Sequence, residues 1–319
     1  MANGKRKIST ISACYNEARN IKPLYERLIK ALGNFSYELE IIFVDNSSTD
    51  NSEEIFRGLA EKDKRVKVLF MSRNFGGPQT SYFAGLQYCS GDAAILLDGD
   101  LQDPPEVIPE LIKKWEEGYD VVYGIRAKRK AKILKRLFYK LFYRVFKKLA
   151  YIDIPLDAGE FGLMDRKVVN EIADFSENEV LVRGLRAFVG FKQVGVEYVR
   201  DDRNAGSSTT SFWQDLKWAK KFIINFSYKP LEWISYVAFF AFLVSCTGIL
   251  LNFVLYLSNP YSPPGIPTII FAIFFFGAVQ LLSLSIIGEY LSKVLQEVKN
   301  RPRYILKEIL NDERNKNKK

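Results

Sequence analysis

The sequence predicts an α/β domain with a mainly parallel sheet, followed by two transmembrane helices. Three features of the 319-residue chain support this prediction. In its first part, short apolar runs alternate with helical patterns, as in parallel strands joined by crossover helices. Each apolar run ends in polar residues. Farther along, no charged residue occurs between Trp233 and Gly288, and a long uncharged apolar stretch is typical of membrane spans.

The strands and helices of the α/β domain are expected to alternate along the chain. Runs rich in Ile, Val, Leu and Phe predict the strands, and helical spacing of apolar residues predicts the helices. We expect strands at residues 8–12, 39–44, 66–71, 93–97 and 121–123, and helices at about 18–32, 50–62, 77–89 and 105–117.

The fourth predicted strand ends in the most informative residues of the chain. Asp98 and Asp100 follow a buried run one residue apart, and Gln102 comes next but one. The carboxyl ends of parallel strands share one edge of a sheet, where ligands bind in open α/β folds. Two carboxylates and a nearby amide suit Mg²⁺ or Mn²⁺ that holds a phosphate. The alternative is that Asp-Gly-Asp only forms a turn.

Asp45 stands at the end of the second predicted strand. Thr49 or Asp50 behind it is expected to cap the next helix. Asp45 precedes that cap and can accept hydrogen bonds from a base or ribose, as acids after the second strand of nucleotide-binding folds do. Gly76-Gly77 lacks the flanking pattern of a P-loop or a dinucleotide fingerprint, which disfavours nucleoside triphosphatase and dehydrogenase functions.

The uncharged stretch divides at residues 258–265 into two apolar segments. Each is long enough to cross a hydrocarbon core of ~30 Å. A buried hairpin in a soluble core is the alternative, but core helices seldom stay apolar on every face for so long. Lysines and arginines flank the pair on both outer sides, and the amino end shows no secretory signal. We therefore expect a protein of the cytoplasmic membrane with both termini in the cytoplasm.

The net charge of +9 is concentrated in one segment. Eleven Lys and Arg residues and no acid lie between Arg126 and Lys148, and apolar residues repeat among them at helical spacing. This pattern predicts a basic amphipathic helix at about residues 127–150 on an anionic membrane surface. Nucleic acid is the alternative partner, but no nucleic-acid-binding motif accompanies the charge, so we expect none to bind.

Histidine is absent, and Cys14, Cys89 and Cys246 lie far apart. The lack of histidine excludes Ser-His triads, histidine bases and histidine-ligated metals, so a catalytic metal must depend on oxygen ligands. The odd number of scattered cysteines indicates a reducing compartment without a disulfide framework.

Together these segments resemble the GT-A fold of family 2 inverting glycosyltransferases. The matching segments are Tyr15-Asn16-Glu17, residues 44–50 and residues 98–106. Residues 157–161, residues 184–191 and the two carboxyl-terminal spans narrow the resemblance to the branch that acts on polyprenyl phosphates, similar to bactoprenol glucosyltransferases and dolichyl-phosphate mannose synthases.

The resemblance implies roles for the residues that match the family pattern. The nucleotide sugar would meet Tyr15, Glu17, Asp45 and Asp98. The divalent metal and the diphosphate would lie among Asp98, Asp100 and Gln102.

The acceptor side of the implied site depends on basic residues. Arg126 and Arg203 would meet the lipid phosphate, and Asp157 would face the reacting sugar as a base or as a positioning group. Asp157, Asp100 and Arg126 would thus take part in catalysis. Three departures from the family pattern are Asn46, where a second Asp is common, Gly162, where Arg is frequent, and residues 207–210, which lack a Lys often found after Gly206.

The implied reaction moves one hexose, with glucose as the expected sugar, from a UDP-sugar to undecaprenyl phosphate with inversion. A phosphate oxygen is already anionic near neutral pH, so the acceptor needs no base. One alternative is a processive polysaccharide synthase, since residues 214–218 faintly match its Gln-x-x-Arg-Trp element. The other is a non-catalytic membrane scaffold. Homo-oligomer formation stays open.

The expected organisation has four parts. They are a cytoplasmic catalytic domain at residues 1–210, an interfacial helix at 211–229, a transmembrane hairpin at 230–290 and a cytoplasmic basic tail at 291–319.

Overall fold

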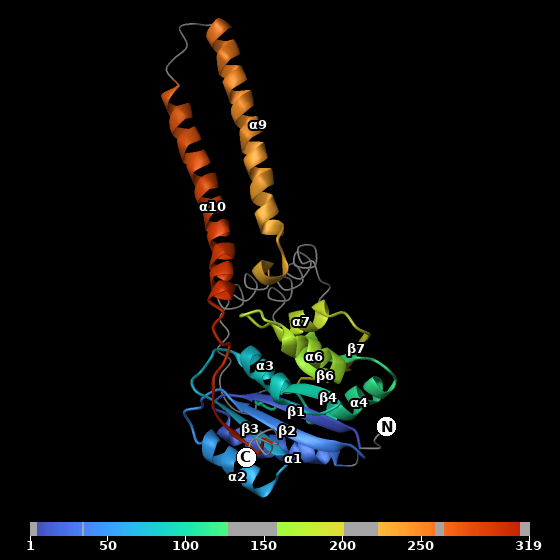
Figure 1. Cartoon of the computed structure of the whole chain (residues 1–319). Coiled ribbons are helices and arrows are strands. Elements are labelled where there is room, and N and C mark those ends of the chain that lie inside the picture. The colour runs from blue at the N-terminus through green and yellow to red at the C-terminus, as the bar shows by residue number, and fades with distance from the viewer. Residues whose placement is uncertain (1–4, 34, 127–157, 201–222, 259–264, 313–319) are drawn as a thin grey trace. The chain divides into compact units, whose positions relative to one another are not determined.

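The computed structural model describes residues 5–33, 35–126, 158–200, 223–258 and 265–312. Figure 1 shows two units, which we describe separately. One unit is an α/β sheet with helices on both faces, and it includes the carboxyl-terminal strand. The other contains two long apolar helices.

The described residues of the α/β unit form one eight-stranded sheet in the order β7-β5-β6-β4-β1-β2-β3-β8. Strands β4, β1, β2 and β3 are parallel neighbours, and β5 pairs in parallel with β7, whereas β6 and β8 pair antiparallel with their neighbours. The strands are β1 (Lys7–Cys14), β2 (Glu38–Asp45), β3 (Val66–Met71), β4 (Ala93–Asp98), β5 (Val121–Arg126), β6 (Ala158–Asp165), β7 (Gln193–Tyr198) and β8 (Leu306–Leu310).

The five strands predicted from apolar runs are present as β1 to β5, which confirms the α/β fold class. The structure adds β6 between β4 and β5. Its sequence, with glycine at positions 159 and 162, has no alternating apolar pattern. A Cβ at Gly162 would lie 2.6 Å from the Val122 carbonyl oxygen, so no side chain fits where an Arg is frequent in the family.

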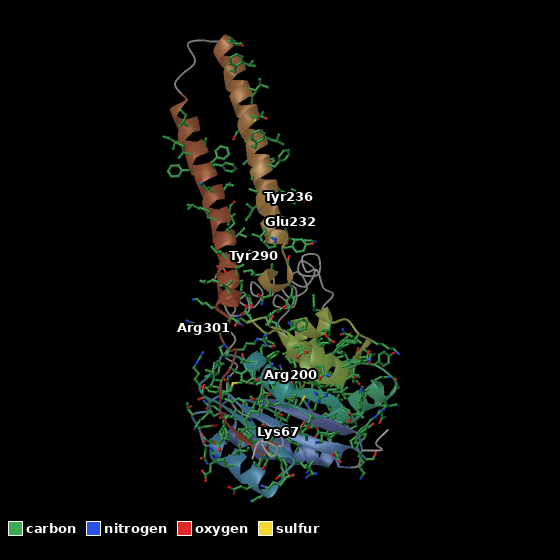
Figure 2. All side chains as sticks on the ribbon, viewed as in Figure 1. Lys67, Arg200, Glu232, Tyr236, Tyr290 and Arg301 are labelled. Atoms are coloured by element: carbon green, nitrogen blue, oxygen red, sulfur yellow. The ribbon has the colours of Figure 1, made fainter. Side chains whose placement is uncertain are left out.

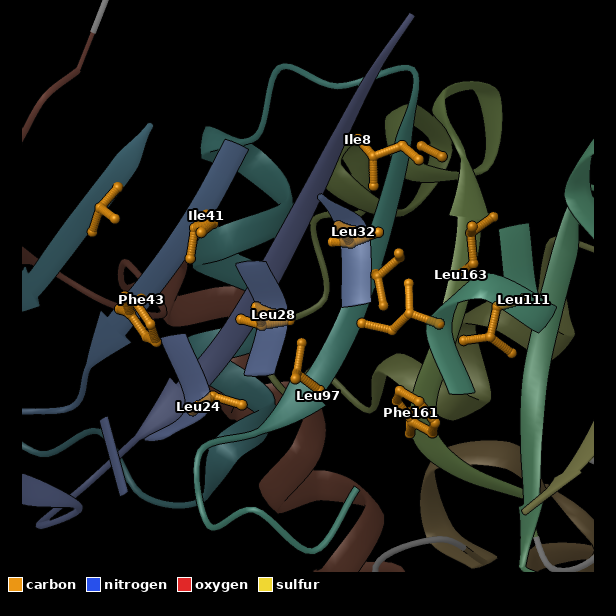
Figure 3. Close-up of a cluster of buried hydrophobic side chains, with 14 of the residues drawn as sticks. Ile8, Leu24, Leu28, Leu32, Ile41, Phe43, Leu97, Leu111, Phe161 and Leu163 are labelled. Atoms are coloured by element: carbon orange, nitrogen blue, oxygen red, sulfur yellow. The ribbon is translucent and has the colours of Figure 1, made fainter. Parts of the chain in front are cut away.

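Helices cover both faces of the sheet, and each face has its own apolar core. Figure 3 shows one core, in which Leu24, Leu28 and Leu32 of α1 meet strand residues such as Phe43 and Leu97. Full burial of each such side chain stabilises the fold by about 1.5–3 kcal/mol. The helices of this unit are α1 (Ala18–Leu32), α2 (Ser52–Lys62), α3 (Pro78–Tyr88), the 3₁₀ turn η1 (Pro105–Val107), α4 (Ile108–Glu116), α6 (Arg166–Asp174) and α7 (Val182–Phe188).

The Asp50 side chain accepts a hydrogen bond from the first backbone N–H group of each of two helices, α1 and α2. Its carboxylate accepts hydrogen bonds from the amide nitrogens of Ala18 at 3.1 Å and Ser52 at 3.1 Å. The residue that precedes α2 is Asn51, one position later than the predicted cap, and its side chain makes no capping hydrogen bond. Asp50 therefore caps α2 through its side chain and ties the start of α1 to it.

The carboxyl-terminal segment was expected to be a basic tail, but part of it belongs to the sheet. Residues 306–310 form β8, which pairs antiparallel with β3. An edge strand needs a partner or a cover, and β8 supplies one for β3. Arg57 of α2 also donates to Glu308 at 3.0 Å. The two charged residues within this short run concealed the strand in the sequence.

The second unit contains α9 (Lys229–Ser258) and α10 (Ile266–Lys299). Each holds a window that is long and apolar enough to cross a membrane, with mean hydropathies of 1.5 and 1.8, and neither window is buried within the structure. Tyr290, labelled in Figure 2, donates a hydrogen bond to the Ser227 carbonyl at 2.7 Å. The predicted basic helix at 127–150 lies outside the described residues, as does the interfacial helix before residue 223.

Candidate functional site

The carboxyl ends of β1, β2 and β4 meet at one edge of the sheet, as the sequence predicted. Strand register places Cys14 beside Asp45 and Ala13 beside Asp98, so β1 separates the two acid-bearing strand ends. A cleft of about 310 Å³ opens at this edge. The residues that line it include Cys14, Tyr15, Glu17, Asn46, Gly76, Gly77, Ser81, Asp98 and Asp100.

Asp98-Gly99-Asp100 forms a tight turn against β1. The Gly99 amide donates to the Ala13 carbonyl at 3.1 Å. A Cβ at Gly99 would lie 2.7 Å from the Cys14 sulfur and 2.9 Å from that carbonyl, so only glycine fits. The Asp100 carboxylate accepts from the Gln102 amide nitrogen at 3.1 Å. The segment is thus a turn, and the turn brings both carboxylates to the cleft.

Asp98 holds one end of a chain of polar side chains. Tyr82, from α3, donates its hydroxyl to Asp98 Oδ1, and Arg200 donates from Nη2 to Asp98 Oδ2 at 3.1 Å. Arg200 Nε also lies 3.5 Å from Asp103 Oδ1. Figure 2 labels Arg200. One guanidinium therefore contacts the carboxylates of two acids.

Asp103 continues the chain toward β5. It accepts from the Tyr198 hydroxyl at 2.7 Å, and Arg126 Nε donates to the same hydroxyl at 3.5 Å. Burial raises the pKa of Asp103 to about 6, and the nearby Asp98 carboxylate adds to that increase. The predicted metal ligand Asp98 and the predicted phosphate ligand Arg126 are thus connected through Arg200, Asp103 and Tyr198.

The cleft concentrates negative charge, and its carboxylate oxygens are ligands that suit a divalent cation. Burial and then the carboxylates of Asp45, Glu17, Asp98 and Asp100 raise the pKa of the Cys14 thiol well above its usual value. Among the residues that the structure describes, no three His, Cys, Asp or Glu side chains converge on one point. Mg²⁺ is usually held by one or two carboxylates plus substrate phosphates, so the pair at 98 and 100 fits a site that a nucleotide completes.

Asn46 lines the cleft, and Asp45 precedes it as the last residue of β2. Asp45 is buried, and it accepts hydrogen bonds from the amide of Ser48 at 3.3 Å and from the Ser48 hydroxyl. Burial raises the pKa of the Asp45 carboxyl. The Asn46 amide donates to the Gly76 carbonyl at 2.6 Å and accepts from the Phe75 amide at 3.0 Å. The departure at position 46 therefore holds the loop that forms one wall of the cleft.

Three arginines gather near the first residues of β6. Arg126 lies so close that a Cβ at Gly159 would be 3.0 Å from its Nη2. From α7, Arg183 donates to the Ala158 carbonyl at 3.0 Å and Arg186 to the Gly159 carbonyl at 3.1 Å. Arg186 is completely buried, and this burial lowers its pKa to about 10.

The predicted site residues fall into three groups. Tyr15, Glu17, Asp98 and Asp100 line the cleft, and Asp45 ends the adjoining strand. Gln102 follows the turn, and Arg126 lies farther along the polar chain. Asp157 and Arg203 lie outside the described residues.

Sequence reasoning missed several polar residues of this region. They are Tyr82, Asp103, Arg183, Arg186, Tyr198 and Arg200. The sequence gives one indication of the two arginines of α7. They are the only charged residues in that seven-residue helix, and their spacing of three places them on the same side of it.

Comparisons with known proteins show the family to which the chain belongs. The profile described as Glycosyl transferase family 2 matches residues 9–173. An uncharacterized glycosyltransferase, YkcC of Bacillus subtilis, is 41% identical over 93% of this chain and 92% of its own length. The prophage-derived bactoprenol glucosyl transferase of Shigella flexneri is 37% identical over 94% of this chain and 97% of its own length. The chain therefore belongs to glycosyl transferase family 2.

Proposed function

We propose that this protein is an inverting membrane glycosyltransferase that moves glucose from UDP-glucose to undecaprenyl phosphate. The observation that carries the proposal is the cleft at the carboxyl edge, which places Asp98 and Asp100 beside the end of β1. Similarity over nearly the full length to proteins named bactoprenol glucosyl transferase supports the choice of sugar and lipid.

In this proposal the nucleotide occupies the cleft. The exposed Tyr15 ring offers an apolar face to the base, and Asp45 accepts hydrogen bonds from the nucleoside. Asp98, Asp100 and Gln102 would hold Mg²⁺ or Mn²⁺ together with the diphosphate. The bound cation would neutralise charge on the departing diphosphate.

The acceptor phosphate would approach from the side of β5. Arg126 would hold it by charge-assisted hydrogen bonds, with Arg203 as a second contact. The acceptor oxygen is anionic and attacks the anomeric carbon while the bond from that carbon to the diphosphate breaks, so no histidine is needed. Asp157 would position the sugar. Precise placement of the two reacting groups supplies much of the rate gain in such a reaction.

We further propose that α9 and α10 cross the membrane as a hairpin and that both termini are cytoplasmic. β7 precedes the two helices in the chain and β8 follows them, yet both strands belong to one sheet. The two strands therefore lie on one side of the membrane, which requires an even number of crossings. The lysines and arginines that flank the pair favour the cytoplasmic side. On this proposal residues 1–210 are the catalytic domain, and 127–150 lies on anionic lipid.

A transfer assay tests the enzymatic proposal. Purified protein receives radiolabelled UDP-glucose, Mg²⁺ and undecaprenyl phosphate. We expect label to enter organic-soluble, acid-labile material with one sugar per lipid, and none to do so when the lipid is omitted. Label found only in a long water-soluble polymer would support a synthase instead. Label that never leaves any common nucleotide sugar would support a scaffold.

Site-directed labelling tests the topology. Tags at Ala2 and Lys319 should both react only when the cytoplasmic face is accessible. A cysteine introduced as Ser262→Cys, with Cys246 replaced by Ser, should react from the opposite face. Labelling of position 262 from the cytoplasmic side would contradict the hairpin.

A further inference from the structure

Arg200 contacts Asp98, a residue that lines the cleft, and the family resemblance assigned no role to this arginine. Its side chain is 24% exposed, and its guanidinium lies between a partly exposed acid and a buried one. Nη2 makes a hydrogen bond to Asp98 at 3.1 Å. Nε is buried and lies 3.5 Å from Asp103 without forming a hydrogen bond to it within the described residues. Arg200 thus makes a hydrogen bond to Asp98 with one nitrogen and an ionic contact with Asp103 with another.

The contact with Asp98 conflicts with the proposed metal site. Asp98 Oδ1 accepts from the Tyr82 hydroxyl, and Oδ2 accepts from Arg200. A divalent cation on the same carboxylate would meet a fixed positive charge within a few ångströms, and like charges at that range repel strongly. Arg200 must therefore release Asp98 when a metal binds there.

We propose that Arg200 neutralises the Asp98 carboxylate before the metal and nucleotide bind. When they bind, the Arg200 Nη2 group leaves Asp98 and donates a hydrogen bond to a phosphate oxygen of the nucleotide. This inference rests on the proposed function, because it concerns the metal and diphosphate of that reaction. Asp103 remains beside Nε as the anchor about which the guanidinium turns. Arg suits this exchange, since its planar group pairs with carboxylates and phosphates alike.

This arrangement makes metal binding depend on the nucleotide. Without a nucleotide, Arg200 competes with the metal for Asp98 and weakens its binding. With a nucleotide, a phosphate accepts the displaced guanidinium, so the same residue favours the loaded state. Removal of Arg200 should therefore have opposite effects on the metal alone and on the nucleotide.

Binding measurements on the full-length protein in detergent test this pair of effects without any sugar transfer. Free Mn²⁺ is followed by electron paramagnetic resonance in the absence of nucleotide. Arg200→Gln should bind Mn²⁺ about tenfold more tightly than the wild type, which corresponds to about 1.4 kcal/mol. At saturating Mn²⁺, the same variant should bind UDP about tenfold more weakly by titration calorimetry.

Arg65→Gln is the matched control. It removes the same charge from the opposite edge of the sheet, where Arg65 pairs with Asp63 at 2.8 Å. Both of its affinities should equal those of the wild type. If Arg200→Gln does not fold, Arg200→Met keeps much of the aliphatic stem, and the same two changes are expected of it.

Two outcomes would overturn the inference. One is Mn²⁺ binding in the Arg200 variant that is no tighter than in the wild type, including the absence of binding in both. The other is UDP binding that is unchanged. Failure of the proposed function would appear elsewhere, as the absence of labelled lipid in the transfer assay.

Discussion

The two edges of the sheet each hold buried charge, but the charges are satisfied in different ways. At the amino edge, Lys67 and Glu40 form an ion pair at 2.7 Å with both side chains almost fully buried. At the carboxyl edge, Asp98 and Asp100 line an open cleft, and Arg200 forms an ion pair with Asp98 at 3.1 Å.

The amino edge is closed by the protein itself. Glu40 accepts hydrogen bonds from the Ser9 hydroxyl at 2.5 Å, the Ser90 amide at 2.8 Å and the Ser90 hydroxyl at 3.0 Å. Lys67, labelled in Figure 2, also donates to the Tyr88 carbonyl at 3.0 Å. Although burial opposes ionisation, Lys67 and these donors hold the pKa of Glu40 below its usual value. This group has the partners that a buried ion pair needs to be stable.

The carboxyl edge brings several acids together beside a cleft, among them Glu17, Asp98 and Asp100. The raised pKa values of Cys14 and Asp103 have burial as their main cause, and neighbouring carboxylates add to it. Acidic groups with perturbed pKa values beside a cleft are common at functional sites, and a metal with a phosphate-bearing ligand is the occupant proposed above. The comparison predicts that substitutions at the amino edge change stability, whereas those at the carboxyl edge change ligand binding and catalysis.

The largest expected effect is that of Asp98→Asn or Asp100→Asn on transfer. Either change removes a metal ligand, and we expect a loss on the order of 10³-fold in the rate, comparable to the loss of a key electrostatic group. The melting temperature should stay within a few degrees of the wild-type value, because the lost charge was not part of the core. Chelation should abolish transfer in the wild type, and added Mg²⁺ or Mn²⁺ should restore it.

Gly58→Ala serves as a control for preparation and assay. It lies in α2, where an added Cβ meets nothing within 4 Å, so it should transfer glucose at the wild-type rate. Full activity of Asp98→Asn in the presence of a chelator would contradict the metal site.

At the amino edge, the predicted effect is on stability. Glu40→Gln removes the carboxylate that lies 2.7 Å from the buried Lys67 and leaves only the longer ionic contact with Asp312 at 4.0 Å among the described residues. We expect a loss of about 3 kcal/mol in the free energy of unfolding. The double change Glu40→Gln with Lys67→Met should recover part of that loss, since an apolar chain replaces the buried lysine, although Asp312 then loses its contact with it. Urea unfolding in detergent measures both.

Transfer per folded molecule should be unchanged in these amino-edge variants. A drop in that value while the protein stays folded would mean that the two edges are coupled, and it would break the comparison.

The sequence predicted strands β1 to β5 because each is a buried run with a local apolar signal. It did not predict β6, β7 or β8. In β6, Gly159 and Gly162 are present because neighbouring side chains and backbone leave no room, and this crowding exists only in the folded protein. In β8, the adjacent charges of Lys307 and Glu308 hide a strand whose formation depends on the exposed edge of β3.

The same distinction applies to the candidate site. Asp45, Asp98 and Asp100 were found because their position at strand ends is a local feature. Tyr82 and Arg200 were missed because their role depends on contacts with Asp98 across 16 and 102 residues of sequence. A side chain on a helix or after an edge strand gives no local sign of the carboxylate that it will meet.

The smallest expected effect distinguishes two acids that lie five residues apart. Burial raises the pKa of Asp45, so ionisation of its carboxyl costs folding free energy as the pH rises above the ordinary pKa of an aspartate. Asp45→Asn removes that cost but weakens the hydrogen bonds from Ser48, so we expect a gain in stability below about 1 kcal/mol. UDP binding should weaken about tenfold, because a charged acceptor for the nucleoside is lost.

Asp50→Asn is the matched control with the opposite sign. The pKa of Asp50 is lowered: burial raises it, but hydrogen bonds from Ser52 and Ala18 outweigh that effect. Its ionised form therefore stabilises the fold at neutral pH, and this contribution is lost as the pH falls through the lowered pKa. Asp50→Asn should lower the free energy of unfolding by about 1 kcal/mol, as the loss of a helix cap does, and leave UDP affinity unchanged. Thermal unfolding of the two variants measures the opposite changes in stability, and calorimetric titration measures their UDP affinities. Equal UDP affinity in the Asp45 variant and the wild type would remove Asp45 from the nucleotide site, and the ligand-binding part of the carboxyl edge would then be confined to the residues that line the cleft.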